Sequence, residues 1–330
     1  MTDAIPPDEI EITRTFWKML EGSELWHIEN IPEAPVAWLR KSLSADGLDI
    51  NFNVKMRHHA GLEHQITYAD FGLVIVYEDK ATRIKFSAPY VVQAKRLYKT
   101  YKSAKTFGAN DKFGASDDDQ RLGLFNISQL IGKNFAKYMA FSPRLDKFDV
   151  NSQAAIRALH EANTGYIYTG TQFGLALAAE LATHRRVQSS GNWMTPISPR
   201  IHTAAALHRN AFDANLPFGW FVIANICALL SQTSERIAPF HSAPGQLLEQ
   251  PIGLNITSDP EDLGLRLALC EDTAVEKVAS ALSVIVKDFY YPPVATLVVE
   301  VKRSRQMELD LFPSEDMGPG PDDPISRFQV

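Results

Sequence analysis

The chain is poor in cysteine, in long apolar runs and in net positive charge. Its 330 residues include only two cysteines, Cys227 and Cys270, each in an apolar segment. This scarcity argues against a disulfide framework or a cysteine-based zinc site, and we expect buried thiols. The longest apolar run, 217–230, is too short and too interrupted to span a membrane, and it is typical of a buried core helix. A formal net charge of −6 argues against a protein that coats nucleic acid through bulk charge.

Two further signals are missing from the sequence. No glycine-rich phosphate loop and no dinucleotide fingerprint occurs. The first residues, 1–9, are acidic and contain prolines, unlike a signal or transit peptide, so we expect a cytoplasmic protein without a membrane partner. The hydrophobic fraction of 45% is enough for one large domain or two ordinary ones.

One short apolar run carries polar residues that a buried strand does not need. In residues 90–97 (Tyr-Val-Val-Gln-Ala-Lys-Arg-Leu), Gln93 and Lys95 are two apart and would share one strand face, while Val92 and Ala94 pack on the other. A second strand-like run, 68–77, has Asp70 near its start. Pairing of the two strands would bring Asp70 beside Gln93 and Lys95.

These groups suit metal-assisted hydrolysis of a phosphodiester. Mg²⁺, or Mn²⁺ in its place, would take oxygen ligands from the Asp70 carboxylate, the Gln93 side chain and the Ala94 carbonyl, together with water and a substrate phosphate. The ion would polarise the phosphate and lower the pKa of a bound water. Lys95 would orient that water or stabilise the developing charge.

In their order and spacing, Asp70, Gln93 and Lys95 resemble the PD-(D/E)xK nuclease superfamily, and within it the Mrr-type restriction endonucleases, in which glutamine replaces the acid of the last motif. The resemblance covers about residues 45–145. It implies an αβββαβ core and Mg²⁺-dependent DNA cleavage in bacterial restriction or phage defence. It also suggests Glu63 as an additional catalytic acid. No proline precedes Asp70, and a single Gly72 stands where a glycine-rich approach is common.

Each part of this motif also has a structural interpretation. A Gln-x-Lys pair often marks the polar face of an edge strand, and a lone aspartate at a strand start is often a turn residue. The alternative function is therefore a noncatalytic nucleic-acid-binding or protein-interaction module that retains the nuclease fold. Because Gln93 carries no charge, we expect Mg²⁺ to bind tightly only once a DNA phosphate completes its shell.

A basic segment follows the Gln93 strand. Residues 91–113 contain six lysines and arginines against one acid, Asp111, with Tyr98, Tyr101 and Phe107 interleaved. This composition predicts contacts with the DNA backbone, made by Arg96, Lys99, Lys102, Lys105 and Lys112. The spacing of three between Lys99, Lys102 and Lys105 would place them on one face if the segment were helical. The alternative is a solvated basic helix or loop.

The remaining periodicity predicts an α/β protein. Helices are expected at 9–20, 35–43 and 119–133, and strands at 48–56 and 137–141, which with the two strands above complete the αβββαβ order within a nuclease-like domain, 1–150. Residues 151–305 are expected to form a mainly helical accessory region, with helices at 152–161, 171–186, 201–212, 218–230 and 273–289. The acidic tail, 306–330, is expected to be disordered.

Three other patterns in the sequence could carry a function. The strand-like run 294–303 contains Glu300-x-Lys302, a rival to Gln93-x-Lys95 that we expect to be structural. His58, His59 and His64 would suit a transition metal but lack one-face spacing. In the tail, Leu309, Leu311 and Phe312 resemble the apolar anchors of a bacterial sliding-clamp-binding peptide.

Cutting both strands of a duplex would need two active sites and hence a homodimer.

Overall fold

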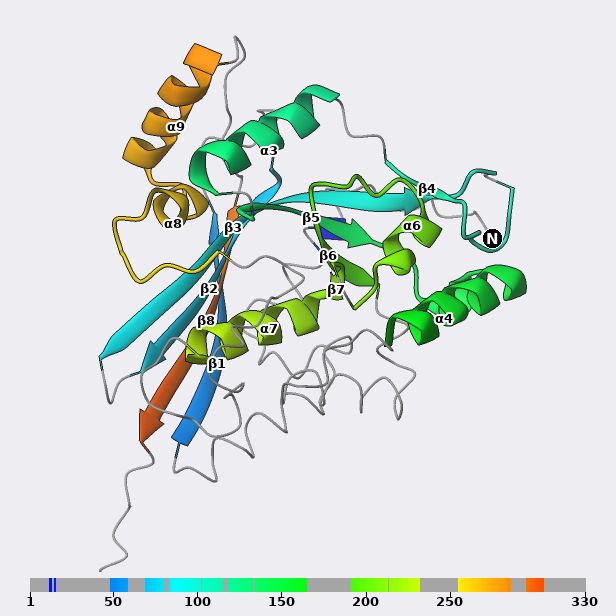
Figure 1. Cartoon of the computed structure of the whole chain (residues 1–330), viewed down its shortest axis with the longest axis horizontal. Coiled ribbons are helices and arrows are strands. Elements are labelled where there is room, and N and C mark those ends of the chain that lie inside the picture. Colours follow the sequence, from blue (N-terminus) through cyan, green and yellow to red (C-terminus); the bar gives the residue numbers. More distant parts are fainter. Residues whose placement is uncertain are drawn as a thin grey trace, which may run out of the picture.

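Figure 1 shows the computed structural model of the chain. The structure describes residues 12–13, 15, 48–58, 69–79, 83–101, 103–114, 118–132, 134–164, 191–212, 214–231, 255–285 and 295–305. The expected helix at 35–43 and the tail therefore lie outside the described residues, and the expected helix at 9–20 is seen only at Ile12, Thr13 and Thr15, which are helical.

A mixed β-sheet forms the centre of the molecule. Seven of its strands follow the order β1-β8-β2-β3-β5-β6-β7, and the short β4 pairs with β3. The pairs β2–β8 and β3–β5 are parallel, and the other pairs are antiparallel. The strands are β1 (Leu48–His58), β2 (Phe71–Asp79), β3 (Ile84–Tyr98), β4 (Lys112–Phe113), β5 (Ala136–Phe141), β6 (Asn192–Pro196), β7 (Leu216–Pro217) and β8 (Ala295–Arg305).

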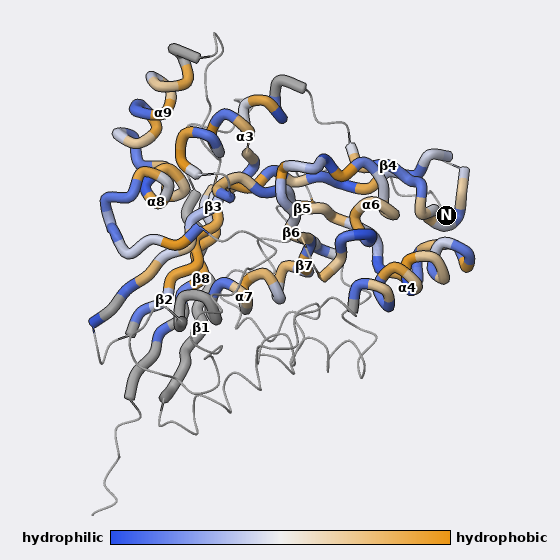
Figure 2. Tube along the Cα trace, in the orientation of Figure 1, coloured by the Kyte–Doolittle hydropathy of each residue, from blue (hydrophilic) through white to orange (hydrophobic). Residues whose placement is uncertain are grey.

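Both faces of the sheet are buried, because alternate residues of its central strands enter two separate apolar clusters. On β2, Leu73 and Ile75 belong to one cluster and Val74 to the other. Figure 2 shows hydrophobic residues along β2, β3 and β8 where helices cover them, and a hydrophilic end of β3 near Ile84. A strand buried on both sides must be apolar in consecutive residues, which explains the continuous runs in these sequences.

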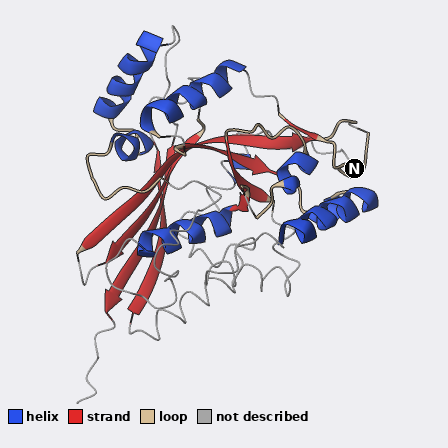
Figure 3. Ribbon diagram, in the orientation of Figure 1, coloured by secondary structure: helices blue, strands red, loops and turns tan. Residues whose placement is uncertain are grey.

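Helices cover each face of the sheet (Figures 1 and 3). Helix α7 (Phe218–Ser231) packs through Trp220 and Phe221 on the face of Leu73. The face of Val74 is covered by α3 (Asp118–Ile131), α8 (Leu263–Ala268) and α9 (Asp272–Ile285). At the β6–β7 end lie α4 (Val150–Thr164), α6 (Ala204–Arg209) and the short 3₁₀ helix η2 (Leu145–Lys147).

The expected α/β class is confirmed, and so are several individual elements. The strands predicted at 48–56 and 137–141 correspond to β1 and β5, and the helices predicted at 119–133, 152–161 and 218–230 correspond to α3, α4 and α7. The helix expected at 201–212 is shorter, because α6 ends at Arg209, and that expected at 273–289 corresponds to α9 as far as the chain is described. The helix expected at 171–186 lies outside the described residues.

The region beyond residue 150 contributes strands to the same sheet as the region before it. β6 and β7 were not predicted, since they are short and have no alternating pattern. β8 is the strand predicted at 294–303, and it lies between β1 and β2. The sheet therefore joins both ends of the described chain, and β1 reaches β2 only through β8.

Within the described residues, no helix is both long and apolar enough to cross a membrane. Cys270, expected to be a buried thiol, is only half-buried, and burial still raises its pKa to about 11. Its backbone adopts a φ of 58° just after α8, where the chain turns toward α9.

Candidate functional site

Asp70 lies directly before β2 and attaches the start of that strand to β3. Its backbone nitrogen donates to the Val92 oxygen at 2.8 Å. Its side-chain Oδ2 accepts a hydrogen bond from the Ala94 backbone nitrogen at 2.6 Å. β2 begins only at Phe71, so the Asp70 carboxylate takes the ladder hydrogen bond that another strand residue would have made. The β2–β3 pairing brings Asp70 to the predicted place.

Gln93 and Lys95 share the sheet face covered by α3, as their spacing predicted. Both are buried, with 3% and 9% of their surfaces exposed. The Gln93 Nε2 donates to Asp70 Oδ2 at 2.7 Å and to the Ala94 oxygen at 3.2 Å. On the opposite face, Val92 and Ala94 enter the apolar core. The structure therefore brings Asp70 and Gln93 into direct contact. Lys95 lies two residues after Gln93 on the same strand.

Gln120, in the first turn of α3, connects Gln93 to Lys95. Its Nε2 donates to Gln93 Oε1 at 3.0 Å, and its Oε1 accepts from Lys95 Nζ at 3.0 Å. The sequence patterns did not single out this residue. The only available signal was the position of Gln120 at the start of the helix that follows the motif strand.

The four side chains form a single hydrogen-bonded chain, Lys95–Gln120–Gln93–Asp70, with an ammonium at one end and a carboxylate at the other. These end charges fix both amides, because an ammonium only donates and a carboxylate only accepts. Rotating Gln93 alone would place its oxygen against Asp70. Rotating Gln120 alone would place its nitrogen against Lys95. We call these four residues the amide relay.

Arg200 and Tyr138 lie near the amide relay. Together with Thr195 they line a small cavity that Lys95 also lines. Tyr138 stands opposite Gln93 in the β3–β5 register, and Arg200 follows the end of β6. A second cation therefore lines the cavity beside Lys95, and no sequence pattern singled out Arg200.

The basic segment after β3 is a loop rather than a helix, so its lysines do not share a helical face. Lys99 Nζ donates to the oxygens of Ala104 and Lys105 at 2.8 and 3.1 Å and lies 4.9 Å from the Phe107 ring centroid. Lys99 thus holds the loop together. Lys105 and Lys112 are exposed, and Arg96 is half-buried.

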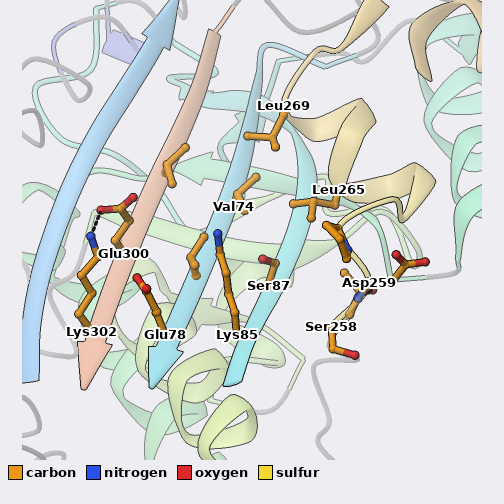
Figure 4. Close-up of a pocket in the computed structure, with 14 residues that line it drawn as sticks. Val74, Glu78, Lys85, Ser87, Ser258, Asp259, Leu265, Leu269, Glu300 and Lys302 are labelled. Atoms are coloured by element: carbon orange, nitrogen blue, oxygen red, sulfur yellow. Dashed lines mark hydrogen bonds and ion pairs between the residues drawn. The ribbon is translucent and has the colours of Figure 1, made fainter. Parts of the chain in front are cut away.

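A groove of about 290 Å³ lies on the same sheet face, at the other end of β2 (Figure 4). Asp70 precedes the start of β2 and Glu78 lies near its end, so the two residues are about 26 Å apart along the strand. The groove has an apolar floor and a charged rim, formed by Val74, Val76, Glu78, Lys85, Ser87, Thr257, Ser258, Asp259, Pro260, Leu265, Leu269, Val298, Glu300 and Lys302.

The rival motif Glu300-x-Lys302 lies in this groove. Lys302 Nζ forms an ion pair with Glu300 Oε2 at 3.3 Å. In the described part of the chain, no group of three or more histidine, cysteine, aspartate or glutamate side chains is placed to hold a metal ion, at either end of β2. The strand predicted at 294–303 is present as β8 from Ala295 onward.

Several predicted residues cannot be placed. Glu63, His59, His64, Lys102 and the tail residues Leu309, Leu311 and Phe312 lie outside the described residues, and for His58 only the backbone, at the end of β1, is described. Comparisons of the chain with protein-family models, with curated proteins and with solved structures gave no match.

Proposed function

We propose that this chain is a metal-dependent DNA endonuclease of the PD-(D/E)xK type, acting in bacterial restriction or phage defence. The observation that supports this proposal is the amide relay. It gathers a carboxylate from the start of β2, an amide and an ammonium from β3, and a second amide from α3. Burying such groups has a cost in free energy that an apolar strand would not incur.

The residues of the site fit a hard divalent cation. Asp70, Gln93 and the Ala94 carbonyl would hold Mg²⁺ or Mn²⁺, which when bound would polarise a phosphate and lower the pKa of a water. Gln93 Nε2 and Asp70 Oδ2 are 2.7 Å apart, so both side chains would reach one ion. Gln93 would have to rotate its amide so that its oxygen replaces its nitrogen at this position.

Lys95 would supply the positive charge for the phosphate. Its ammonium donates to the neutral Gln120 amide rather than to a carboxylate, so this hydrogen bond fixes the ammonium without neutralising it. Arg200, which lines the same small cavity, would add a second cation. Gln120 acts as a positioning residue, because it holds Lys95 and Gln93 in a fixed relation.

A noncatalytic nucleic-acid-binding module is the second candidate. The observation that favours it is the satisfied state of the amide relay. Asp70 Oδ2 accepts two hydrogen bonds, and each amide of the relay has a partner at both ends. A site that is complete without metal would also persist in a descendant that had lost catalysis.

Cleavage assays separate the two candidates. The wild type, Lys95→Ala and Lys85→Ala would be incubated with Mg²⁺ or Mn²⁺ and plasmid, linear or single-stranded DNA. Lys85 is the matched control, because it lies on the same strand but lines the groove at the far end of β2. The endonuclease predicts cleavage by the wild type and Lys85→Ala and its loss in Lys95→Ala. Equal cleavage by all three proteins, or none on any DNA, would count against it.

A further inference from the structure

Two tyrosines at the end of β3 expose their rings to solvent. Tyr98 is 44% exposed and Tyr101 is 74% exposed, whereas Tyr77, Tyr90 and Tyr138 are buried. Tyr98 is the last residue of β3, and Tyr101 lies in the loop that follows it. Exposed aromatic rings offer flat apolar faces on which a planar group can stack.

The loop that carries Tyr101 is held in shape by its own charged groups. The buried Asp111 carboxylate accepts hydrogen bonds from the backbone nitrogens of Thr100 and Gly108, both at 2.8 Å. Lys99 binds two loop carbonyls from the other side. Tyr101 therefore stands on an ordered platform, which lowers the conformational entropy that binding would cost.

Neighbouring elements attach the same loop to the body of the protein. Phe107 exchanges backbone hydrogen bonds with Lys147 and Asp149, at 2.9 and 2.8 Å. The Ala109 nitrogen donates to Ser152 Oγ at 2.7 Å, and the Ala205 nitrogen donates to the Ala109 oxygen at 2.8 Å. Hydrogen bonds from the starts of α4 and α6 thus hold the loop in place. The Tyr101 side chain remains 74% exposed.

Two cations lie beside Tyr98. The Arg96 guanidinium lies 4.9 Å from the Tyr98 ring centroid, and Lys112 stands directly opposite Tyr98 in the β3–β4 register. Lys105 is exposed on the loop. Asp111, the acid within this segment, is buried and bonded to backbone nitrogens. The surface therefore combines aromatic faces with positive charge.

We propose that Tyr98 and Tyr101 stack on unpaired bases while Arg96, Lys105 and Lys112 bind the phosphates of the same strand, so that the chain takes DNA with a single-stranded segment. This assignment of substrate rests on the proposed endonuclease function. Aromatic rings stack on the faces of unpaired bases, and cations follow the backbone. In a duplex each base face is already covered by its neighbours, so a stacking surface favours single strands.

This surface adjoins the amide relay through β3. Lys95 and Tyr98 are three residues apart, about 10 Å along the strand, and point to opposite faces. The aromatic surface and the amide relay therefore occupy neighbouring stretches of the same strand.

Fluorescence anisotropy in EDTA tests the proposal without any cleavage. The probes are a labelled oligothymidylate and a duplex hairpin with the same number of nucleotides. The variants are Tyr98→Ala, Tyr101→Ala and Tyr101→Phe, with Phe125→Ala as the matched control, because Phe125 is also 44% exposed but lies on α3.

We expect each tyrosine-to-alanine change to weaken binding of the single strand about 5- to 150-fold and that of the hairpin less than about 2-fold. Tyr101→Phe and Phe125→Ala should bind as the wild type does. Unchanged single-strand affinity in both alanine variants, or equal losses on both probes, would overturn the proposal. A different result, the absence of metal-dependent cleavage, would contradict the proposed endonuclease function. Binding measured in EDTA does not depend on that result.

Discussion

Gln120 Nε2 donates a hydrogen bond to Gln93 Oε1 across 3.0 Å, which joins the start of α3 to the middle of β3. Gln93 is thereby held with its nitrogen toward Asp70 and its oxygen toward the helix. Gln120 therefore holds the Gln93 amide in the same orientation that the Asp70 carboxylate requires.

Replacing Gln120 should destabilise the protein and disturb the amide relay. Gln120→Ala leaves the buried Gln93 oxygen without its donor and removes the acceptor of Lys95, so we expect the free energy of unfolding to fall by about 1–3 kcal/mol. Urea denaturation measures it. Gln129→Ala, at an exposed position of the same helix, should change it by less than about 0.5 kcal/mol. Equal effects of the two changes would show that the amide relay contributes nothing to the free energy of unfolding.

A second carboxylate at position 93 should couple stability to metal. Gln93→Glu removes the donor to Asp70 Oδ2 and places two negative charges at hydrogen-bond distance. We expect a lower melting temperature than the wild type in EDTA, and recovery in Mg²⁺, because the ion would bridge the carboxylates. Differential scanning fluorimetry measures both. Gln129→Glu is the control and should not respond to Mg²⁺, and a Gln93→Glu protein equally indifferent to Mg²⁺ would argue against a cation site.

Gly72 allows α8 to approach β2 two residues after Asp70. A Cβ at this position would overlap the backbone oxygen of Ala268 and lie 2.9 Å from Thr296 Oγ1, which itself donates to that oxygen at 2.6 Å. Gly72→Ala should therefore lower the free energy of unfolding by about 1–3 kcal/mol or more. Gly108→Ala is the control, since its nearest neighbour would be Asp149 Oδ2 at 3.8 Å. Urea denaturation that ranks the two alike would contradict this packing argument.

The buried pair His160 and His208 should make stability depend on pH. Their rings join α4 to α6 through a 3.0 Å contact between Nε2 of His160 and Nδ1 of His208. Burial lowers the pKa of His160 to about 4, and burial with repulsion from His160 lowers the pKa of His208 well below its usual value. Both groups are neutral in the folded protein, while an unfolded histidine takes up a proton near pH 6.5.

The unfolded state therefore binds more protons as the pH falls, so the stabilisation is complete above about pH 6.5. It declines toward pH 4, where His160 titrates in the folded protein. His160 alone should contribute a loss of about 3 kcal/mol over this range. Urea denaturation at stepped pH measures the slope. His202→Gln, at an exposed position before α6, should leave the profile unchanged. A wild-type profile that is flat between pH 6.5 and 4 would contradict the prediction.

The sequence alone determined the local elements and the near neighbours in the site. Period-two alternation placed Gln93 and Lys95 on one face of β3, and the two adjacent apolar runs paired as β2 and β3, which carried Asp70 to Gln93. These outcomes depend on strand geometry and on partners close in the chain, both of which are visible in a local pattern.

Only the tertiary structure decided the rest. The position of β8 between β1 and β2 comes from pairings across more than 200 residues of chain, which no local pattern specifies. Gln120 joins the site because α3 packs on the sheet face of Val91. Lys99 binds the Ala104 carbonyl because the loop folds back toward the end of β3. Hydrophobic periodicity tells which side of an element is buried, whereas the identity of the neighbour it meets depends on how all the elements pack together.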